Sequence, residues 1–329
     1  MNRLPVLAIL NPTCLDIVES QRQWLQNQGV QVLADPAYRK FSAAQIRDVL
    51  RQANGVVLPA AVRTVPSEHD MAEAKQLKVC AIAASGFEWF DLEAATRQGI
   101  VVTYAPGGMG AQVVAELAWG LILAATRQIV FHHNLLSRGD ETRGMGVAVS
   151  GKTLGIVGLG AIGREVALRA KGFQMRLIAH DPFAEPSVAA ELGVELTSLE
   201  RLLQESDIVT LHVRLSEETR GMIAERQLRM MKPSAFLINA ARKELIDESA
   251  LVNALLEGRL GGVGLDDPPG EPGKQLFGLP NVVLTPHLGN RALEGTIAVF
   301  RSAVQSAIAV LEGQKPNSVL NPSVYDRVR

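Results

Sequence analysis

The sequence predicts an α/β protein with two Rossmann-like domains, each built on a parallel sheet. Short apolar runs rich in Val, Ile and Ala alternate with amphipathic segments along most of the chain, as expected for βαβ units. The chain has 329 residues, of which 47% are apolar and 20% charged. That length and composition are sufficient for two domains with large cores.

The first third of the chain shows the alternation most clearly. We expect strands at residues 6–10, 31–34, 56–59, 79–84 and 100–103, and helices at 16–28, 43–52, 68–76 and 92–97. This pattern predicts a small parallel sheet with helices on both faces. Two loops that follow strands, 59–65 and 85–90, lie where open α/β sheets bind ligands.

The middle of the chain differs in character. Residues 111–129 are rich in Ala, Leu and Val and predict a long, largely buried helix. Residues 131–150 are polar and predict an exposed arm or a subunit contact. His132 and His133 are adjacent and cannot share one helix face, so a metal site there is the less favoured alternative.

The last part of the chain returns to the alternating pattern. We expect strands at 208–213, 235–241, 261–266 and 282–285, and helices at 199–205, 224–230, 248–257 and 292–311.

A glycine-rich turn follows the predicted strand 153–157. Gly158, Gly160 and Gly163 have the spacing G-x-G-x-x-G, and a predicted helix begins at Ala161. The glycines allow a tight turn, close approach of the backbone to a diphosphate, and close helix–strand packing. The helix N-terminus offers free N–H groups and a partial positive charge. This turn therefore predicts a dinucleotide site.

Asp181 indicates which dinucleotide binds. It ends the next predicted strand, 21 positions after Gly160, where a carboxylate can accept the hydroxyls of an adenosine ribose. A carboxylate repels the 2′-phosphate of NADP, and no Arg or Lys lies between Asp181 and Arg201 to bind that phosphate. We therefore expect NAD.

Composition excludes several classes of partner. The formal charge of −1 gives no electrostatic reason to expect nucleic acid or an acidic membrane as a partner.

The two cysteines and the apolar runs bear on the cellular compartment. Cys14 and Cys80 lie in apolar contexts without metal-type spacing, as in a reduced cytoplasmic protein. No apolar run has the length of a signal-peptide core or a membrane helix. We expect a cytoplasmic protein without a metal.

Three predicted strands in the second half end at charged or titratable residues. They are followed by Arg242, by Asp266 with Glu271 in the next loop, and by His287. The carboxyl ends of parallel strands share one edge of a sheet, here beside the glycine turn. An arginine can bind a carboxylate and polarise a carbonyl, and a histidine with an acidic partner can move a hydroxyl proton. These groups suit hydride transfer to a 2-oxo acid.

Five motifs occur in the order and spacing of a known family: GLGAIG (158–163), HDP (180–182), NAAR with LIDESALVNALLEGRLGG (239–262), GLDDPPGEP (264–272) and TPHLG (285–289). With them the chain resembles, over nearly its whole length, the D-isomer-specific 2-hydroxyacid dehydrogenases, which include phosphoglycerate dehydrogenase and glyoxylate/hydroxypyruvate reductase. The resemblance implies a doubly wound NAD-binding domain (104–288) inserted in a smaller flavodoxin-like substrate domain (1–103 and 289–329). It also implies a homodimer formed through residues 111–150.

The resemblance also assigns roles to individual residues. Arg242 would bind and polarise the substrate, His287 would be the general acid/base, and Glu271 would be the acid paired with His287. The backbone N–H groups of Ser85 and Gly86 would bind the substrate carboxylate. The remaining cofactor contacts implied by the family, besides the three glycines, are Ala161, Ile162, Asp181, Val213, Ala240, Ala241 and Asp266.

Some positions depart from the family pattern. Lys243 stands where the family usually has glycine, Arg291 stands where a small residue is usual, and Arg63 is offset from the arginine of phosphoglycerate dehydrogenases. These departures indicate a substrate outside the best-known members of the family. The offset of Arg63 disfavours a phosphorylated substrate, and Lys243 or Arg291 could meet a second negative charge on the substrate. The expected activity is NAD-dependent interconversion of a D-2-hydroxy acid and its 2-oxo acid. Alternatives are an NAD(H)-sensing protein of the corepressor type and, more remotely, formate dehydrogenase, which has Gln in place of Glu271, or phosphite oxidation.

Overall fold

The computed structural model describes residues 4–10, 15–34, 42–59, 65–84, 86–87, 89–105, 109–267 and 269–326. The chain forms two compact units, Met1–Gly110 with Leu293–Arg329, and Ala111–Ala292. Each is an α/β unit with an all-parallel sheet, so the predicted fold class is confirmed. The functional boundaries expected from the sequence, 103/104 and 288/289, remain a prediction.

The first unit contains a five-stranded sheet of order β2-β1-β3-β4-β5. This is the strand order of flavodoxin-like folds. Its strands are β1 (Val6–Ile9), β2 (Gln31–Leu33), β3 (Gly55–Pro59), β4 (Val79–Ala83) and β5 (Val101–Tyr104). Its helices are α1 (Leu15–Ser20), α2 (Arg22–Gln26), α3 (Ala43–Gln52), α4 (Glu68–Glu73), α5 (Leu92–Arg97) and α13 (Leu293–Leu311).

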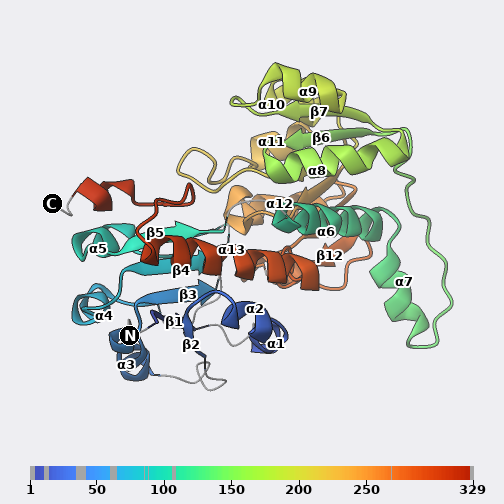
Figure 1. Ribbon diagram of the computed structural model, residues 1–329. Coiled ribbons are helices and arrows are strands. Elements are labelled where there is room, and N and C mark those ends of the chain that lie inside the picture. The colour runs from blue at the N-terminus through green and yellow to red at the C-terminus, as the bar shows by residue number, and fades with distance from the viewer. Residues whose placement is uncertain are drawn as a thin grey trace. The chain divides into compact units, whose positions relative to one another are not determined.

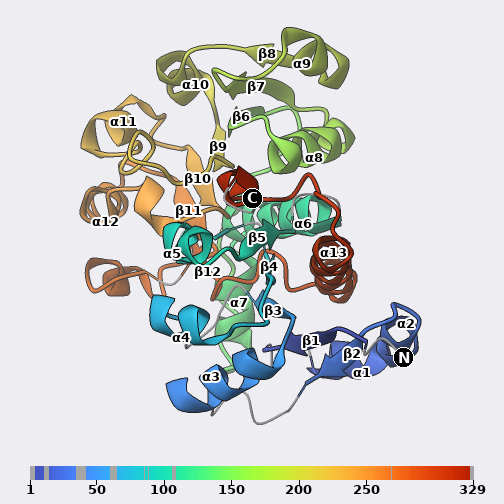
Figure 2. The ribbon, with the colours of Figure 1, turned by 60° about the vertical axis from the view of Figure 1, so that its left-hand side comes forward.

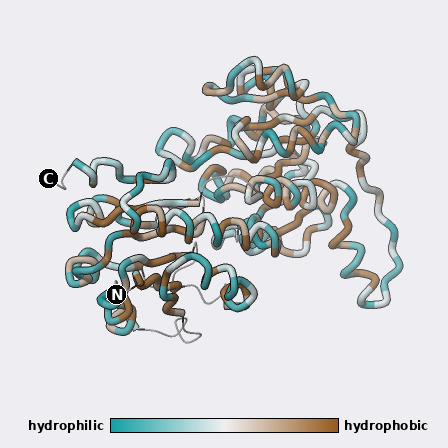
Figure 3. The backbone as a smooth tube through the Cα atoms, in the orientation of Figure 1, coloured by the Kyte–Doolittle hydropathy of each residue, from teal (hydrophilic) through white to brown (hydrophobic). Residues whose placement is uncertain are grey.

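Helices cover both faces of this sheet. On one face α13 buries Phe300, Ala303 and Val304 against the strands, and Figure 1 shows this helix beside β3, β4 and β5. Brown and teal segments alternate along α13 in Figure 3, as expected for a helix with one buried face. The other face packs against α3, α4 and α5, which contribute Leu50 and Met71 among others.

The second unit contains a seven-stranded sheet of order β12-β11-β10-β9-β6-β7-β8. Numbered within the unit, its first six strands have the order 3-2-1-4-5-6 of dinucleotide-binding folds, with one further strand at the edge. The strands are β6 (Thr153–Val157), β7 (Arg176–His180), β8 (Val194–Leu196), β9 (Ile208–Leu211), β10 (Phe236–Asn239), β11 (Gly262–Leu265) and β12 (Val282–Leu284).

Two hydrophobic clusters hold this sheet between helices. One lies under α6 (Met109–Thr126) and α8 (Ala161–Ala170), and the other under α10 (Leu199–Glu205), α11 (Glu225–Met230) and α12 (Glu248–Leu256). Figure 2 shows α8 on one side of β6 and β9, with α10 and α11 on the other. The point where the strand order reverses, between β6 and β9, is where doubly wound sheets bind ligands.

The prediction for residues 131–150 is partly wrong, because the segment begins within a helix. α7 (Ile129–Leu136) precedes an extended arm that has no regular structure. His132 joins the two: its Nδ1 lies 2.9 Å from the Gln128 carbonyl, and its Nε2 accepts a 2.7 Å hydrogen bond from the Gly144 amide. The sequence pattern also missed β8 and the preceding α9 (Pro186–Leu192), and the segment 16–28 divides into α1 and α2.

The long apolar helix α6 raises the question of a membrane span. Among the described residues, no single helix is long and apolar enough to cross a membrane. The pair formed by α6 and α7 passes on length and composition only when taken together, and the two helices are bent by 62° at their junction.

Candidate active site in the 111–292 unit

The glycine turn between β6 and α8 can be built only with glycine at two positions. Gly158 has φ +93°, and a Cβ there would lie 2.8 Å from the His212 carbonyl carbon. A Cβ on Gly163 would lie 2.1 Å from the Gly158 carbonyl oxygen. A Cβ on Gly160 would meet no described atom within 4 Å, so this glycine faces open space. The turn is therefore closely packed against the protein at Gly158 and Gly163, and it is open at Gly160, where a ligand could approach the backbone.

The N-terminus of α8 is suited to an anionic group. Gly160 is the N-cap and has no side chain to cap the helix, so no side chain satisfies the first N–H groups there. Ala161 and Ile162 form the first turn and carry small or apolar side chains. Unsatisfied N–H groups and the helix dipole together favour a diphosphate.

Asp181 follows β7 directly and is held against the glycine turn. Its Oδ2 accepts a 2.8 Å hydrogen bond from the Leu159 amide, and its Oδ1 accepts a 2.9 Å bond from the Phe183 amide. Each carboxylate oxygen can accept a second hydrogen bond, so the group can still receive ribose hydroxyls. The glycine turn, the open helix N-terminus and Asp181 therefore fit an NAD molecule.

β9 and β10 end on the same side of the sheet as β6, where the glycine turn begins. β6 pairs with β9, and β9 pairs with β10. Val213 follows β9, and its Cγ1 would lie 2.9 Å from a Cβ on Gly158. Ala240 and Ala241 follow β10. These positions agree with their predicted place near the cofactor, while their contact with it remains a prediction.

Arg242 lies in a loop that the buried side chain of Asn239 fixes. The Asn239 amide nitrogen donates a 2.7 Å hydrogen bond to the Arg242 carbonyl, and its oxygen accepts a 2.9 Å bond from the Ala241 amide. The Arg242 guanidinium donates a 2.9 Å bond to the Ala241 carbonyl. Asn239 thus positions the predicted substrate arginine, a role that the sequence analysis did not assign.

The buried carboxylate of Asp266 holds the loop that carries His287. Oδ1 accepts hydrogen bonds of 2.6 Å from both the Thr285 hydroxyl and the Leu288 amide, and Oδ2 accepts a 2.7 Å bond from the Gly289 amide. His287 itself has φ +59°, a left-handed conformation that costs a non-glycine residue on the order of 1 kcal/mol. The three hydrogen bonds to Asp266 stabilise this conformation. A cofactor contact by Asp266 remains a prediction.

The acid beside His287 in this structure is Asp267. His287 Nδ1 lies 3.5 Å from Asp267 Oδ1, and the Lys243 amide donates a 3.3 Å hydrogen bond to Asp267 Oδ2. Burial by itself would raise the pKa of Asp267. The hydrogen bond from the His287 ring, the hydrogen bond from the Lys243 amide and electrostatic attraction to these two residues outweigh burial and lower that pKa.

Glu271, the acid that the family pattern pairs with His287, contacts a different residue. Its side chain is 84% exposed, and its Oε1 accepts a 2.6 Å hydrogen bond from Lys274 Nζ. Both residues belong to the turn around a short 3-10 helix, Pro272–Leu276.

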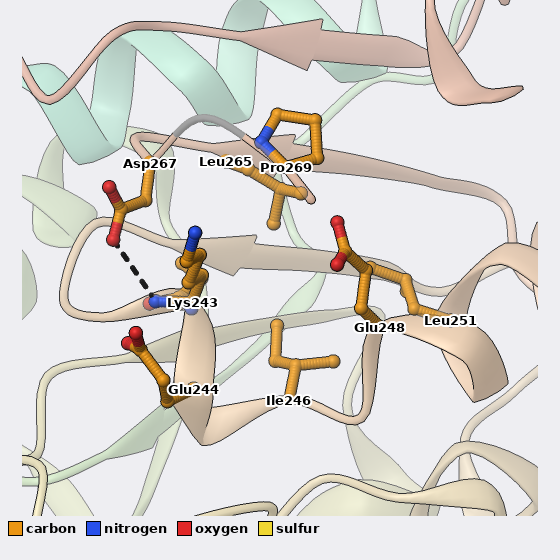
Figure 4. A pocket seen from close by; sticks show the side chains of 9 residues that line it. Lys243, Glu244, Ile246, Glu248, Leu251, Leu265, Asp267 and Pro269 are labelled. Carbon is orange, nitrogen blue, oxygen red and sulfur yellow. Dashed lines mark hydrogen bonds between the residues drawn. The ribbon is translucent and has the colours of Figure 1, made fainter. Parts of the chain in front are cut away.

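A cavity of about 190 Å³ adjoins these loops. Figure 4 shows Lys243 and Asp267 at one end, with the dashed bond between them, and Glu248 and Leu251 at the other. Glu248 Oε1 is buried and accepts no hydrogen bond from the described residues. The cavity therefore has a charged end at the Asp267 loop and an apolar wall formed by Ile246, Leu251 and Leu265.

Two predicted substrate contacts belong to the other unit. Ser85 lies outside the described residues. Gly86 is part of the irregular segment after β4 and is partly buried. Their binding of a carboxylate remains a prediction. Among the described residues, no group of three or more His, Cys, Asp or Glu side chains could hold a metal ion.

Comparison with known proteins places this fold and motif set in one family. A model for the NAD-binding domain of D-isomer-specific 2-hydroxyacid dehydrogenases matches residues 119–289. The glyoxylate reductase of Thermococcus litoralis is 40% identical over 262 residues, covering 76% of this chain and 79% of the relative. That of Thermococcus gammatolerans is 36% identical over 301 residues, covering 88% and 89%.

Solved structures agree with this assignment. A protein of Thermus thermophilus is 33% identical, with a TM-score of 0.79, and the match covers 96% of this chain and 99% of that one. The NAD complex of a D-isomer-specific 2-hydroxyacid dehydrogenase from Lactobacillus delbrueckii is 25% identical, with a TM-score of 0.82 and the same coverage. From its fold, its glycine turn and these relatives, the chain belongs to the D-isomer-specific 2-hydroxyacid dehydrogenase family and is an NAD-dependent 2-hydroxyacid oxidoreductase.

Proposed function

We propose that this enzyme interconverts a D-2-hydroxy acid and its 2-oxo acid, with His287 as the general acid/base. One observation carries the proposal. β10, β11 and β12 are adjacent, parallel and in register, with Asn239 opposite Leu265 and Leu265 opposite Leu284. Arg242, Asp266 and His287 each follow the end of one of these strands by no more than three residues. This arrangement supports the proposal, because it would put the Arg242 guanidinium and the His287 imidazole at the carboxyl ends of the strands, where the glycine turn also lies.

Each side chain then has a definite task. Arg242 would bind the substrate carboxylate and polarise its carbonyl, because a guanidinium offers paired donors to oxygen. His287 would donate a proton to the carbonyl oxygen during reduction and accept it from the hydroxyl during oxidation. Bound NAD(H) supplies or receives the hydride. The loop fixed by Asp266 would keep the imidazole in place throughout.

We propose a small 2-oxo acid of the glyoxylate class as the substrate. The support comes from the names of the relatives, which are glyoxylate reductases at 36% to 40% identity over most of their length.

A spectrophotometric screen tests the proposed activity. Oxidation of NADH is followed with glyoxylate, hydroxypyruvate, pyruvate, and branched, dicarboxylic and phosphorylated 2-oxo acids. The reverse reaction is followed with D- and L-enantiomers of one chiral 2-hydroxy acid. We expect turnover with small 2-oxo acids and oxidation of the D-enantiomer only. Tight binding of NADH without turnover of any acid would favour an NAD(H)-sensing protein of the corepressor type, and oxidation of the L-enantiomer would contradict the stereochemical assignment.

We also propose a cytoplasmic homodimer formed through residues 111–150. Support comes from large apolar side chains that are exposed along α7 and the arm: Ile129 is 54% exposed, Leu136 64% and Met145 92%. An exposed apolar group of this kind is typical of a protein–protein contact. The buried, unpaired thiol of Cys80 agrees with a reducing compartment.

A further inference from the structure

The His132 side chain connects α7 to the arm, which comprises residues 140–149. After α7 the chain reverses direction and the arm runs back beside the helix (Figure 1). The His132 ring lies between the two segments. Its Nδ1 is 2.9 Å from the Gln128 carbonyl oxygen at the start of α7, and its Nε2 accepts a 2.7 Å hydrogen bond from the Gly144 amide of the arm.

These two contacts fix the protonation state of the ring. A carbonyl oxygen can only accept a hydrogen bond, so Nδ1 must carry a hydrogen. A backbone amide can only donate one, so Nε2 must offer its lone pair. The ring therefore joins α7 to the arm only in its neutral form, with hydrogen on Nδ1. An imidazolium carries a hydrogen on both nitrogens, and its Nε2 hydrogen would face the hydrogen of the Gly144 amide.

The arm is packed closely around this contact. A Cβ on Gly144 would lie 2.8 Å from His132 Nε2 and 2.9 Å from Gln128 Oε1, and a Cβ on Gly146 would lie 2.8 Å from the Thr126 carbonyl oxygen. The Val147 amide donates a 2.7 Å hydrogen bond to the same carbonyl. The arm thus lies against the junction of α6 and α7, and it has no room for a hydrogen between the Gly144 amide and the ring.

From this geometry we propose that His132 is a pH-sensitive contact: the neutral ring fixes the arm to α7, and protonation of the ring releases the arm. The inference rests on the proposed function in one respect, the dimer formed through α7 and the arm. Leu136 lies on α7, and Met145 directly follows Gly144. Release of the arm would separate these two exposed apolar side chains, so the dimer should weaken as the pH falls.

The charged groups around the ring agree with this direction. Among the described residues, the histidines that pair with a carboxylate are His69 and His287, so no acid stabilises an imidazolium at His132. Hydrogen bonds from Thr142 lower the pKa of Asp140, which therefore stays ionised near neutral pH. The released arm allows a proton to bind that the fixed arm excludes, so the fixed arm is favoured at high pH. The charged or titratable residues nearest to the two contacts in sequence are Arg127, His133, Asp140, Glu141 and Arg143.

Three variants of the full-length enzyme test the proposal. His132→Gln keeps an oxygen that can accept the hydrogen bond from the Gly144 amide but cannot be protonated near neutral pH. His132→Lys places a permanent cation at the position. His133→Gln is the matched control, because it removes the neighbouring histidine, whose side chain is exposed on α7.

Subunit exchange measures how fast the dimers dissociate. Donor- and acceptor-labelled dimers are mixed, and energy transfer is followed at about pH 8 and about pH 5.5, on either side of the ordinary histidine pKa of about 6.5. We expect wild type and His133→Gln to exchange about tenfold faster at the lower pH, because a dimer loses two such hydrogen bonds. His132→Gln should change less than about threefold between the two pH values, and His132→Lys should exchange rapidly at both.

Cleavage of the arm measures the His132 contact without the dimer. An arginine-specific protease is used at about pH 8 in the Leu136→Glu background, and cleavage after Arg143 is followed. Adding His132→Lys should raise the cleavage rate about tenfold, and adding His132→Gln should leave it within about threefold. If the Lys variant does not fold, as judged by NADH binding, the subunit exchange of wild type and His132→Gln decides.

The two measurements separate failure of the proposal from failure of the dimer. Equal pH dependence of exchange in wild type and His132→Gln would overturn the role of His132, as would an unchanged cleavage rate in a folded His132→Lys variant. A wild type that is monomeric at both pH values would refute the proposed dimer only. Cleavage of that monomer after Arg143 would then decide whether His132 fixes the arm.

Discussion

Asp266 Oδ1 accepts a 2.6 Å hydrogen bond from the Leu288 amide, which ties the end of β11 to the loop that carries His287. The carboxylate is buried, with 3% of the residue exposed, and two further donors from the same loop complete its hydrogen bonding. The left-handed backbone of His287 is therefore stabilised by a buried acid that directly follows the neighbouring strand β11.

Asp266→Ala removes the carboxylate that accepts the hydrogen bonds from the Thr285 hydroxyl and from the Leu288 and Gly289 amides. Bonds to a buried carboxylate contribute roughly 1.5 to 3 kcal/mol each, and the loss of several leaves their donors unpaired. We expect the free energy of unfolding of the 111–292 unit to fall by about 3 kcal/mol, and kcat to fall at least tenfold. Chemical denaturation and steady-state kinetics measure the two effects. Asp266→Asn keeps one acceptor oxygen and should lose less of both, and a fully stable and active Asp266→Ala variant would contradict this role.

Asp181→Ala tests the selection of NAD. The variant removes the carboxylate that would accept the ribose hydroxyls and repel a 2′-phosphate. We expect the ratio of kcat/KM with NAD to kcat/KM with NADP to fall at least tenfold, because loss of one charge-assisted hydrogen bond costs about 1.4 kcal/mol or more. Asp181→Asn removes the charge but keeps an oxygen that can accept the hydrogen bond from the Leu159 amide. Comparison of the two variants therefore separates the effect of the charge from the effect of a changed loop structure. An unchanged ratio in both variants would exclude Asp181 as the selecting residue.

His212 gives the stability of the enzyme a specific pH dependence. The residue follows β9, its Nδ1 is buried, and its Nε2 lies 2.8 Å from the Thr210 hydroxyl. Burial lowers the pKa of the imidazole to about 4, from an ordinary 6.5. Between these pH values the unfolded chain binds a proton that the folded chain does not, so the free energy of unfolding falls as the pH is lowered, by roughly 3 kcal/mol over the window.

Urea denaturation at pH 7 and at pH 4.5 measures this effect. His212→Gln should reduce the loss of stability between the two values, and His69→Gln, which removes a histidine that is 66% exposed on α4, should not. Equal pH dependence in wild type and His212→Gln would show that His212 does not carry the effect.

Leu136→Glu tests the proposed dimer. Leu136 is 64% exposed on α7, and a charge there would have to be buried without a partner in a dimer contact. Sedimentation at micromolar concentration should show a wild-type dimer and a monomeric variant. The matched control is Leu256→Glu, which places the same charge at a 53% exposed position on α12 and should remain dimeric. A monomeric wild type would contradict the prediction.

The alternation of apolar and amphipathic segments was sufficient to predict the fold class, because buried parallel strands and covering helices have distinct periods. It predicted α3, α5 and α10 with the bounds that the structure gives. It missed β8, a three-residue strand at the sheet edge, and α7, because the polar residues 131–150 were expected to form an exposed arm or a subunit contact. His132 links this helix to the arm, because its ring contacts the Gln128 carbonyl on one side and the Gly144 amide on the other.

At the candidate site, the sequence predicted which strand ends carry chemistry but not how their side chains pair. Spacing predicted the glycine turn with Asp181 beside it. In the structure Gly158 and Gly163 have surroundings that only glycine allows, and Asp181 accepts a hydrogen bond from the Leu159 amide of that turn. The family resemblance pairs Glu271 with His287, whereas in the structure Asp267, four positions earlier in the same loop, lies 3.5 Å from the His287 ring. This difference depends on the path of the loop and on Lys274, which binds Glu271 locally.

The central claim is that His287 moves the substrate proton in a 2-hydroxyacid dehydrogenase. Its most direct test is the turnover number of His287→Asn with NADH and the best 2-oxo acid from the screen, together with the Kd for NADH from fluorescence. We predict that kcat falls by about 10² to 10⁴, the usual contribution of a general acid, while the Kd changes less than about threefold. A kcat within a few-fold of wild type would contradict the account.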